Sequence, residues 1–417
     1  MIRSPHCAPE SVPLACPSPG NLRALQHPLK RPLWRRLAIG VLGGVLACSA
    51  MAQGTWSKLA TSGPAMSVRS TPAAAAIGPN VYLFGGVFDD FRATEFVFFN
   101  DLHRFDTRTH AWVQLAPAGA LPPPRAFAAG VAVAHRQLML VFGGATYPKD
   151  NSSVVAFDDL WAYDVQRNEW SQLRPDNTGP SGRVRPSMWQ RGDRTYVFGG
   201  VDATFRALND LWAFDLAANR WTQLIPDGAP GSPPARFEAY AGSDAVLGKL
   251  TVYGGQAGAD AGFAPRGDTW QFNVLTSTWS DVTPPAASNI TPARNIGAAA
   301  QIGLSLYVHG GDLPGGSSGC GSGFPQNPTS ELWRYSLLRR TWEQVVPAGD
   351  ALPRLKRTVA ASVGTRMFVF AGFDFACSNE TGGQVFNDSV YSYNPLPVPA
   401  LPITLPAPPT LPGVPGR

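Results

Sequence analysis

The stretch NDLWAFDLAANRW, residues 209–221, decides the fold because variants of it recur along the chain. Each copy places an aromatic residue or His two positions before a second aromatic residue, which precedes a polar residue and then, six positions later, a Trp. The other four copies occupy residues 100–112, 158–170, 267–279 and 330–342. A spacing that is kept through five copies predicts an internal repeat.

A second signature, an apolar stretch ending in two small residues, precedes each copy and occurs once more near the end. The six stretches are VYLFGG (81–86), LMLVFGG (138–144), TYVFGG (195–200), LTVYGG (250–255), LYVHGG (306–311) and MFVFAG (367–372). A stretch rich in small residues stands before each of them. Because runs of β-branched and aromatic residues are bounded by Gly, Pro and Asn, each unit is expected to form four short strands, the last containing the Trp.

These Gly-Gly, aromatic and Trp positions resemble the kelch repeat, whose units are the four-stranded blades of a β-propeller. The resemblance covers roughly residues 54–394 and implies an all-β, six-bladed kelch β-propeller. The sixth unit ends with the aromatic stretch 388–394 and has no Trp strand after it, whereas TWSKL (55–59) is a Trp strand without its other three. We therefore expect Trp56 to supply the outer strand of the sixth blade and to close the ring, which covers exposed strand edges.

Residues 1–52 have the layout of a secretory signal peptide. Basic residues lead into the apolar run 37–50 and an Ala50-Met51-Ala52 end, so cleavage is expected after Ala52. An uncleaved anchor or a lipoprotein beginning at Cys48 are the alternatives, but the run is short for a membrane span. The expected product is secreted or lies in the periplasm or cell envelope, with no stable membrane span. Its Ala-, Arg-, Gly- and Pro-rich composition is typical of a bacterium with a GC-rich genome.

After cleavage, residues 53–394 would form the propeller and residues 395–417 a disordered tail, because nine of these 23 residues are Pro. The leader carries six of the 34 Lys and Arg residues and one of the 29 acidic residues, which leaves 28 of each sign. The mature chain is thus neutral, and its charge argues against nucleic acid as a partner.

Two cysteines, Cys320 and Cys377, remain after the leader is removed. Each follows the Gly-Gly or Ala-Gly of a neighbouring repeat, and the compartment is expected to be oxidising. A Cys320–Cys377 disulfide is therefore predicted. Two free thiols or a metal-binding pair are the alternatives.

No catalytic residue, metal site or cofactor is predicted. The acidic residues and the polar residues five positions later recur in every copy, whereas a catalytic group is needed once, so hydrogen bonds at turns and strand ends explain them better. Kelch propellers include copper-radical oxidases resembling galactose oxidase, but His103 and His309 occupy aromatic positions of the repeat and are expected to pack. The other enzymatic alternative is an envelope enzyme resembling kelch sialic-acid epimerases, with Glu238 as its carboxylate.

An arginine enters the first strand of each unit, and the resemblance to protein-adaptor kelch propellers implies that these arginines surround a central mouth. Guanidinium groups bind carboxylates in pairs of hydrogen bonds, so the ligand, a protein or a carbohydrate, is expected to be acidic. Arg354 is one residue out of register, and Arg357 is a second candidate for its place. The alternative is that the arginines pair with blade carboxylates. The candidate ligand-binding residues are Arg69, Arg125, Arg183, Arg236, Arg294 and Arg354.

Four loops between the second and third strands differ in length and sequence, as expected of a recognition surface on a rigid scaffold. They are residues 88–100, 146–158, 256–268 and 312–331. The sequence therefore predicts an exported binding protein that recognises a protein or saccharide through propeller loops and an arginine-lined mouth.

Overall fold

The computed structural model describes residues 53–395 apart from 151, 245, 286–290, 320–321 and 376–382. The predicted signal peptide, the predicted Cys320–Cys377 disulfide and all but the first residue of the proline-rich tail lie outside the described residues.

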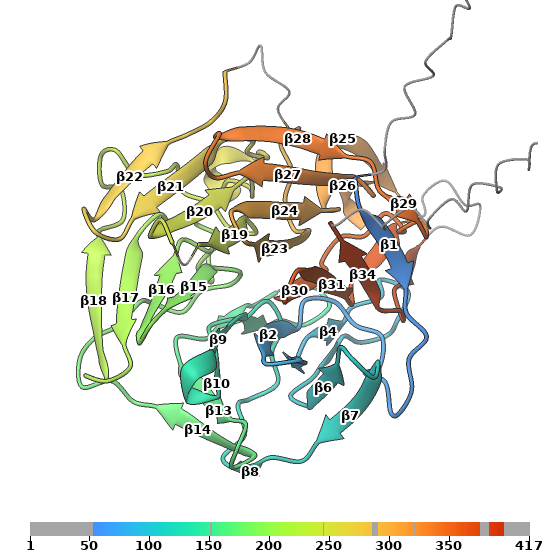
Figure 1. Ribbon diagram of the computed structural model, residues 1–417. Coiled ribbons are helices and arrows are strands. Elements are labelled where there is room, and N and C mark those ends of the chain that lie inside the picture. Colours follow the sequence, from blue (N-terminus) through green and yellow to red (C-terminus); the bar gives the residue numbers. More distant parts are fainter. Residues whose placement is uncertain are drawn as a thin grey trace, which may run out of the picture. The chain divides into compact units, whose positions relative to one another are not determined.

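Six antiparallel sheets of four main strands, which we call blades 1 to 6, surround a common centre (Figure 1). Blade 1 contains β2 (Ala73–Ile77), β3 (Asn80–Phe84), β6 (Leu102–Asp106) and β7 (Ala111–Leu115); blade 2 contains β9 (Ala129–Val133), β10 (Leu138–Phe142), β13 (Leu160–Asp164) and β14 (Glu169–Leu173). Blade 3 contains β15 (Ser187–Arg191), β16 (Arg194–Phe198), β17 (Leu211–Asp215) and β18 (Arg220–Ile225); blade 4 contains β19 (Tyr240–Ser243), β20 (Lys249–Tyr253), β21 (Thr269–Asn273) and β22 (Thr278–Asp281). Blade 5 contains β23 (Ala298–Ile302), β24 (Ser305–His309), β27 (Leu332–Ser336) and β28 (Thr341–Val345); blade 6 contains β30 (Val359–Val363), β31 (Arg366–Phe370), β34 (Tyr391–Asn394) and β1 (Thr55–Lys58).

The ring closes as the sequence predicted. β1 pairs antiparallel with β34, placing Trp56 opposite Tyr393, so the first described strand completes the blade built from the last. The inner strands contact one another in the order β2, β9, β15, β19, β23, β30 and back to β2. The fold is therefore the expected six-bladed, all-β propeller. Two short strands, β8 (Ala118–Gly119) and β29 (Ala348–Gly349), extend the outer edges of blades 2 and 6.

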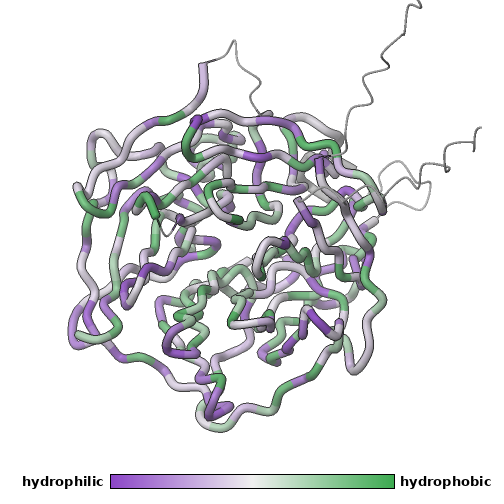
Figure 2. Tube along the Cα trace, in the orientation of Figure 1, coloured by the Kyte–Doolittle hydropathy of each residue, from purple (hydrophilic) through white to green (hydrophobic). Residues whose placement is uncertain are grey.

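Small residues in the inner strands let the blades approach closely near the axis. A Cβ on Gly130 of β9 would lie 3.0 Å from the backbone nitrogen and oxygen of Ala74 in the neighbouring blade. Larger side chains would separate these strands, which explains the Ala- and Gly-rich first strand of the repeat. Hydrophobic segments are distributed over all six blades (Figure 2).

The polar residues of the repeated motif stabilise turns. In NDLWAFDLAANRW, the Asp215 carboxylate accepts hydrogen bonds from the backbone N–H groups of Ala217 and Ala218, at 3.1 and 3.0 Å. Asn219 follows with φ of 49°, a left-handed conformation that Asn tolerates. This polar residue of the motif therefore stabilises the turn that follows its strand, as expected from its repetition.

The loops between the second and third strands contain short additional strands. Four are two-stranded: β4 (Val87–Phe88) with β5 (Val97–Phe98), β11 (Ala145–Thr146) with β12 (Val155–Ala156), β25 (Asp312–Gly319) with β26 (Ser322–Pro328), and β32 (Phe373–Phe375) with β33 (Gln384–Phe386). The only helical elements in the described residues are two 3-10 turns, η1 (Ala134–Arg136) and η2 (Ala259–Ala261). Neither has the length or the hydropathy needed to cross a membrane.

Candidate functional site: the central cavity

A closed ring of backbone hydrogen bonds links the six blades at the entry to their inner strands. The donor in each blade lies two positions after the arginine position of the repeat and gives its N–H to the equivalent carbonyl of the preceding blade, at 2.6–3.4 Å. All six donors have φ between 54° and 60°. The backbone repeats, but the side chains at this level do not. The six residues are Thr71, Phe127, Arg185, Glu238, Ile296 and Arg357.

A cavity of about 610 Å³ lies at this level, walled by the loops between second and third strands. All four irregular loops singled out in the sequence contribute, through residues such as Asp89, Tyr147, Phe263 and Asp312. Its volume falls within the range of pockets that hold small molecules or a few side chains of a partner. The loops that differ from unit to unit therefore meet at this cavity.

Most of the cavity wall is aromatic or aliphatic. Phe96 and Tyr147 meet edge to face with ring centroids 6.0 Å apart, and Phe205 and Phe263 do the same at 6.2 Å. Such pairs hold one another's orientation, so the wall is a packed surface and not a set of loose side chains. The aromatic residues lining the cavity are Phe91, Phe96, Phe127, Tyr147, Phe205, Phe237, Phe263 and Phe373.

Charged groups gather where blade 6 faces its neighbours. Lys356 Nζ lies 2.5 Å from Asp312 Oδ2 of blade 5 and donates to Gln326 Oε1 at 2.5 Å. The next residue, Arg357, forms an ion pair with Asp89 of blade 1. Burial lowers the pKa of Lys356, although the Asp312 carboxylate opposes that shift. Blade 6 therefore contributes two adjacent cations that bind carboxylates on opposite sides.

A third carboxyl group, Glu238, lies in the floor of the cavity. Its Oε2 accepts a hydrogen bond of 2.7 Å from Gln256 Nε2, and Gln256 Oε1 accepts one of 3.2 Å from Asn295. Burial raises the pKa of Glu238, and the nearby charges of Arg185 and Arg357 oppose this. Burial also lowers the pKa of Arg185 to about 10, so this guanidinium stays charged at neutral pH.

The arginine-lined mouth expected from the sequence is not what the described residues form. The first five arginines are at most 1% exposed and point into their blades, where they pair with carboxylates of the third-strand motif. In blade 3, Arg183 Nη1 and Nη2 donate to the two oxygens of Asp210 at 2.7 and 3.0 Å. None of the six candidate arginines is among the residues that line the central cavity. The pairs are Arg69–Asp101, Arg125–Asp159, Arg183–Asp210, Arg236–Asp268 and Arg294–Glu331.

Each pair is further tied into its blade. The arginine also donates to the carbonyl of the first small residue of Gly-Gly, as Arg183 does to Gly199 at 3.0 Å. The carboxylate accepts from the indole of the motif, as Asp210 does from Trp212 at 2.8 Å. Burial alone would raise the pKa of Asp159, yet hydrogen bonds and charge from Arg125 hold it below its usual value. The pairs therefore stabilise the blades.

Blade 6 lacks both members of the pair. Leu355 takes the arginine position, since its carbonyl accepts from Gly311 as the arginine carbonyls do elsewhere. Ser389 stands where the strand pairing places the carboxylate of other blades. Arg354 lies one residue before the arginine position, and its side chain is 46% exposed with Nη2 3.4 Å from Asp374 Oδ1. Losing both charges together avoids leaving one buried and unpaired.

The histidines take the structural positions assigned to them. His103 replaces the indole of its motif and contacts Asp101 through Nε2 at 2.9 Å. His309 is fully buried, neither ring nitrogen has a hydrogen-bond partner among the described residues, and burial lowers its pKa to about 3. Within the described part of the chain, no three His, Cys, Asp or Glu side chains converge as metal ligands would.

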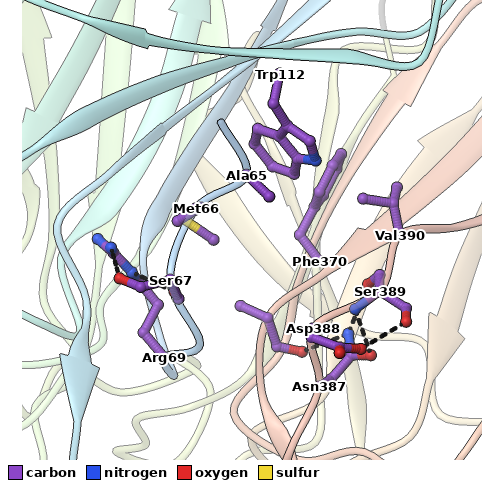
Figure 3. A pocket seen from close by; sticks show the side chains of 11 residues that line it. Ala65, Met66, Ser67, Arg69, Trp112, Phe370, Asn387, Asp388, Ser389 and Val390 are labelled. Atoms are coloured by element: carbon purple, nitrogen blue, oxygen red, sulfur yellow. Dashed lines mark hydrogen bonds between the residues drawn. The ribbon is translucent and has the colours of Figure 1, made fainter. Parts of the chain in front are cut away.

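A second hollow lies where blades 1 and 6 meet (Figure 3). Trp112 and Phe370 line it with ring centroids 5.8 Å apart, and Arg69 borders it beside Ser67. Its volume of about 10 Å³ is close to the minimum for one water molecule. This hollow is a packing feature, so the central cavity is the candidate site.

Sequence reasoning located the four loops, Glu238 and Arg357 but missed Asp89, Asp312 and Lys356. A usable signal existed for Lys356. It follows the arginine position of the repeat, where the other blades have Ser70, Ala126, Val184, Phe237 and Asn295. Comparing the units position by position would have marked it as a substitution toward charge. Asp89 and Asp312 lie in irregular loops, where the units cannot be aligned position by position.

Comparison with known proteins agrees with this architecture. The chain matches the family model described as the KLHDC2/KLHL20/DRC7 Kelch-repeats domain over residues 44–200 and 97–311. It is 30% identical over 281 residues to an N-(sulfonatooxy)prop-2-enimidothioate sulfolyase of Thlaspi arvense, covering 63% of this chain and 75% of that protein. It is also 27% identical over 347 residues to human kelch domain-containing protein 10, covering 81% of this chain and 70% of that protein.

Host cell factor 1 of Rattus norvegicus is 28% identical over 383 residues, which is 86% of this chain but only 16% of that much longer protein. These matches, with the repeat and the six closed blades, define the class as a kelch-type β-propeller. The chain belongs to the kelch-repeat family.

Proposed function

We propose that this chain is an exported binding protein that holds a protein partner on the loop face of its propeller. The observation that carries the proposal is the central cavity, because residues from all four irregular loops meet in it above a repeating, rigid ring. Relatives such as host cell factor 1 and kelch domain-containing protein 10 support an interaction role for the fold.

A photo-crosslinking experiment tests the location of the partner. A photoreactive amino acid is placed at Val154, which lines the cavity, and separately at Leu275, which is 83% exposed in the turn joining β21 to β22, at the opposite end of the strands. Discrete protein adducts in the native cells are expected at position 154 alone. The absence of adducts, or equal labelling from both positions, would refute the proposal.

The proposal of export rests on the leader. Tyr393 donates to the carbonyl of Gln53 at 2.5 Å, and β1 begins at Thr55, so cleavage after Ala52 would keep every residue that closes the ring. We expect the protein isolated from a periplasmic or culture fraction to begin at Gln53 and to weigh two hydrogen atoms less than its reduced form, as one Cys320–Cys377 disulfide requires. Intact mass before and after reduction measures both.

A second candidate, chemistry on a small molecule, is favoured by the match to a sulfolyase. The cavity holds Glu238, whose pKa burial raises, and Lys356, whose pKa burial lowers, a combination that suits proton transfer. Turnover of an N-sulfonatooxy thioimidate that is lost in Glu238→Gln but kept in Glu95→Gln, an exposed control, would establish it. The sugar-acting alternative would use the same groups and has no separate observation in its favour.

A further inference from the structure

We propose that residues 226–229 form a movable strap, which this structure holds open and which closes over the outer edge of blade 4 by pairing with Trp279. The strand that carries Trp279, β22, is the outermost strand of its blade and lies at the rim of the propeller (Figure 1). The inference goes beyond the proposed function and does not depend on it, because the strap acts at the rim and not in the central cavity.

Blades 1, 2 and 6 show what a closed strap looks like. The chain that arrives from the preceding blade pairs in parallel with their fourth strands. At blade 1, Ser62 N–H donates to the carbonyl of His110 at 3.1 Å, and the Ser62 carbonyl accepts from Trp112 N–H at 2.8 Å. A Cβ on the next residue, Gly63, would overlap the carbonyl oxygen of Trp112, so glycine is required there. These contacts cover backbone groups that an open edge would present to other chains.

The segment before blade 4 has the same spacing in the sequence. Each covering glycine lies seven positions after the fourth-strand Trp of the preceding blade, and its φ is 79–90°. Gly228 lies seven positions after Trp221 of blade 3, and its φ is 74°. The chain therefore carries a closing segment at this position too. The three covering pairs are Trp56–Gly63, Trp112–Gly119 and Trp342–Gly349.

The outer edge of blade 4 is nevertheless open. A Cβ on Gly228 would meet no atom within 4 Å. Trp279 has the same register against its third strand as Trp112, so its backbone N–H and carbonyl face outward. Neither group has a hydrogen-bond partner among the described residues. Trp279 is accordingly 9% exposed, against 1–5% for the five other Trp residues that pack between blades.

Two residues of the loop joining β16 to β17 form a latch that holds the strap open. Asn209 donates its backbone N–H to the Asp227 carboxylate at 2.9 Å and accepts from Gly228 N–H through its side-chain oxygen at 2.7 Å. Arg206 Nη1 donates to the same carboxylate at 2.6 Å, in an exposed ion pair of the kind that contributes little to stability. Closing exchanges these bonds for bonds to β22 that are similar in number and kind. The two positions of the strap are therefore close in free energy.

A β-bulge in blade 3 supplies the length of chain that this movement needs. Leu224 is an extra residue in β18, between the partners of Leu211 and Trp212. In blades 1, 2 and 5 the same pairing runs without a bulge. When the bulge is removed, Leu224 pairs with Leu211 as in the regular blades, and one residue of chain returns to the strap.

Hydrogen–deuterium exchange at the Trp279 amide tests the strap in the full chain. In the open position this N–H has no acceptor, so it is expected to exchange at least about tenfold faster than that of Trp112, which a closed segment covers. Asn209→Ala removes the side-chain bonds of the latch to Gly228 and Pro233. The closed population should rise, and exchange at Trp279 should slow at least about threefold and up to about tenfold, the equivalent of one hydrogen bond.

Gly228→Ala separates closure from a general change in stability. In the closed position its methyl group has no room beside the carbonyl of Trp279, so Asn209→Ala combined with Gly228→Ala is expected to lose the slowing. Gly231→Ala is the matched control, because Gly231 is also left-handed with open space around it, and this change should keep the slowing.

Arg206→Gln provides a second way to weaken the latch. It removes the ion pair with Asp227 and should slow exchange at Trp279 in the same direction but less, and melting temperatures verify that each variant is folded. Exchange at Trp279 as slow as at Trp112 in the unaltered chain would overturn the inference. So would the absence of slowing in both latch variants, or equal effects of the two glycine substitutions.

Discussion

Trp221 of blade 3 packs against Phe142 of blade 2, with ring centroids 5.6 Å apart. The same contact recurs around the ring, between the Trp of each fourth strand and the aromatic residue before Gly-Gly in the preceding blade. The two signatures that define the repeat in the sequence therefore meet across blade boundaries. The other pairs are Phe84–Trp170, Phe198–Trp279, Tyr253–Trp342, His309–Trp56 and Phe370–Trp112.

His309 is the exception in this series, and it predicts a pH-dependent stability. Its pKa is about 3 in the folded chain against 6.5 for an ordinary His, so the unfolded chain binds the proton first as the pH falls. The free energy of unfolding should decrease below pH 6.5 by up to about 1.4 kcal/mol per pH unit until pH 3. His309→Phe is expected to remove this part of the slope and to stabilise the chain at neutral pH by about 1 kcal/mol or more.

Urea unfolding at several pH values measures the effect. The reverse change in blade 1, Phe84→His, places an imidazole in an equivalent buried position and should steepen the acid slope. Equal slopes in the unaltered chain and in His309→Phe would contradict the assigned pKa.

The pair Arg183–Asp210 predicts a strong difference between single and double substitutions. Asp210→Ser leaves the guanidinium of Arg183, which is 0% exposed, without its carboxylate and should destabilise the fold by about 3–5 kcal/mol. Arg183→Leu combined with Asp210→Ser reproduces what blade 6 has in Leu355 and Ser389. The double variant is expected to recover most of the loss in urea unfolding, and a loss equal to the sum of the single changes would argue against this account.

The second glycine of each Gly-Gly pair is predicted to tolerate no side chain. Gly144 has φ of 89°, and a Cβ there would lie 2.6 Å from the carbonyl oxygen of Ala126. Gly144→Ala should therefore destabilise by more than about 1–2 kcal/mol, the usual penalty of a left-handed residue alone. Gly192, with φ of 56° and open space around it, is the matched control, because Gly192→Ala carries only that penalty. Equal melting temperatures for the two variants would contradict the close contact.

The sequence predicted the fold more completely than the site, for a physical reason. Blade packing places the same demands on every unit, so Trp221, Phe214 and the Gly-Gly pair carry a signal five or six times over. The cavity is built where the units differ. Lys356 and Asp312 lie 44 residues apart in the chain, and the packing of blade 6 against blade 5 brings them to 2.5 Å.

The regularly spaced arginines were assigned to a ligand site, whereas the structure places five of them inside the blades. Their regular spacing made them conspicuous in the sequence, and a ring of cations at a central mouth followed from the resemblance. Their regular recurrence indicates a role in stabilising each blade, as it does for the acidic residues. Arg183 pairs with Asp210 in its own blade, just as Arg125 pairs with Asp159. Blade 6 breaks the pattern at Leu355, and there the next two positions carry the cations of the cavity.

Trp56 lies in β1, the strand that completes blade 6 and closes the ring. Trp56 is 4% exposed, and its ring centroid lies 5.5 Å from that of His309 and 5.1 Å from that of Tyr393. Among the Trp residues that pack between blades in the described chain, it alone precedes the first complete blade. Trp56→Ala is expected to destabilise the whole propeller by about 3–5 kcal/mol, because removing it opens the joint between blades 5 and 6. Lys58→Ala, on the same strand but exposed, should change stability by less than about 0.5 kcal/mol. Urea unfolding should give one cooperative transition in each case; an unchanged midpoint for Trp56→Ala would mean that β1 does not hold the ring together.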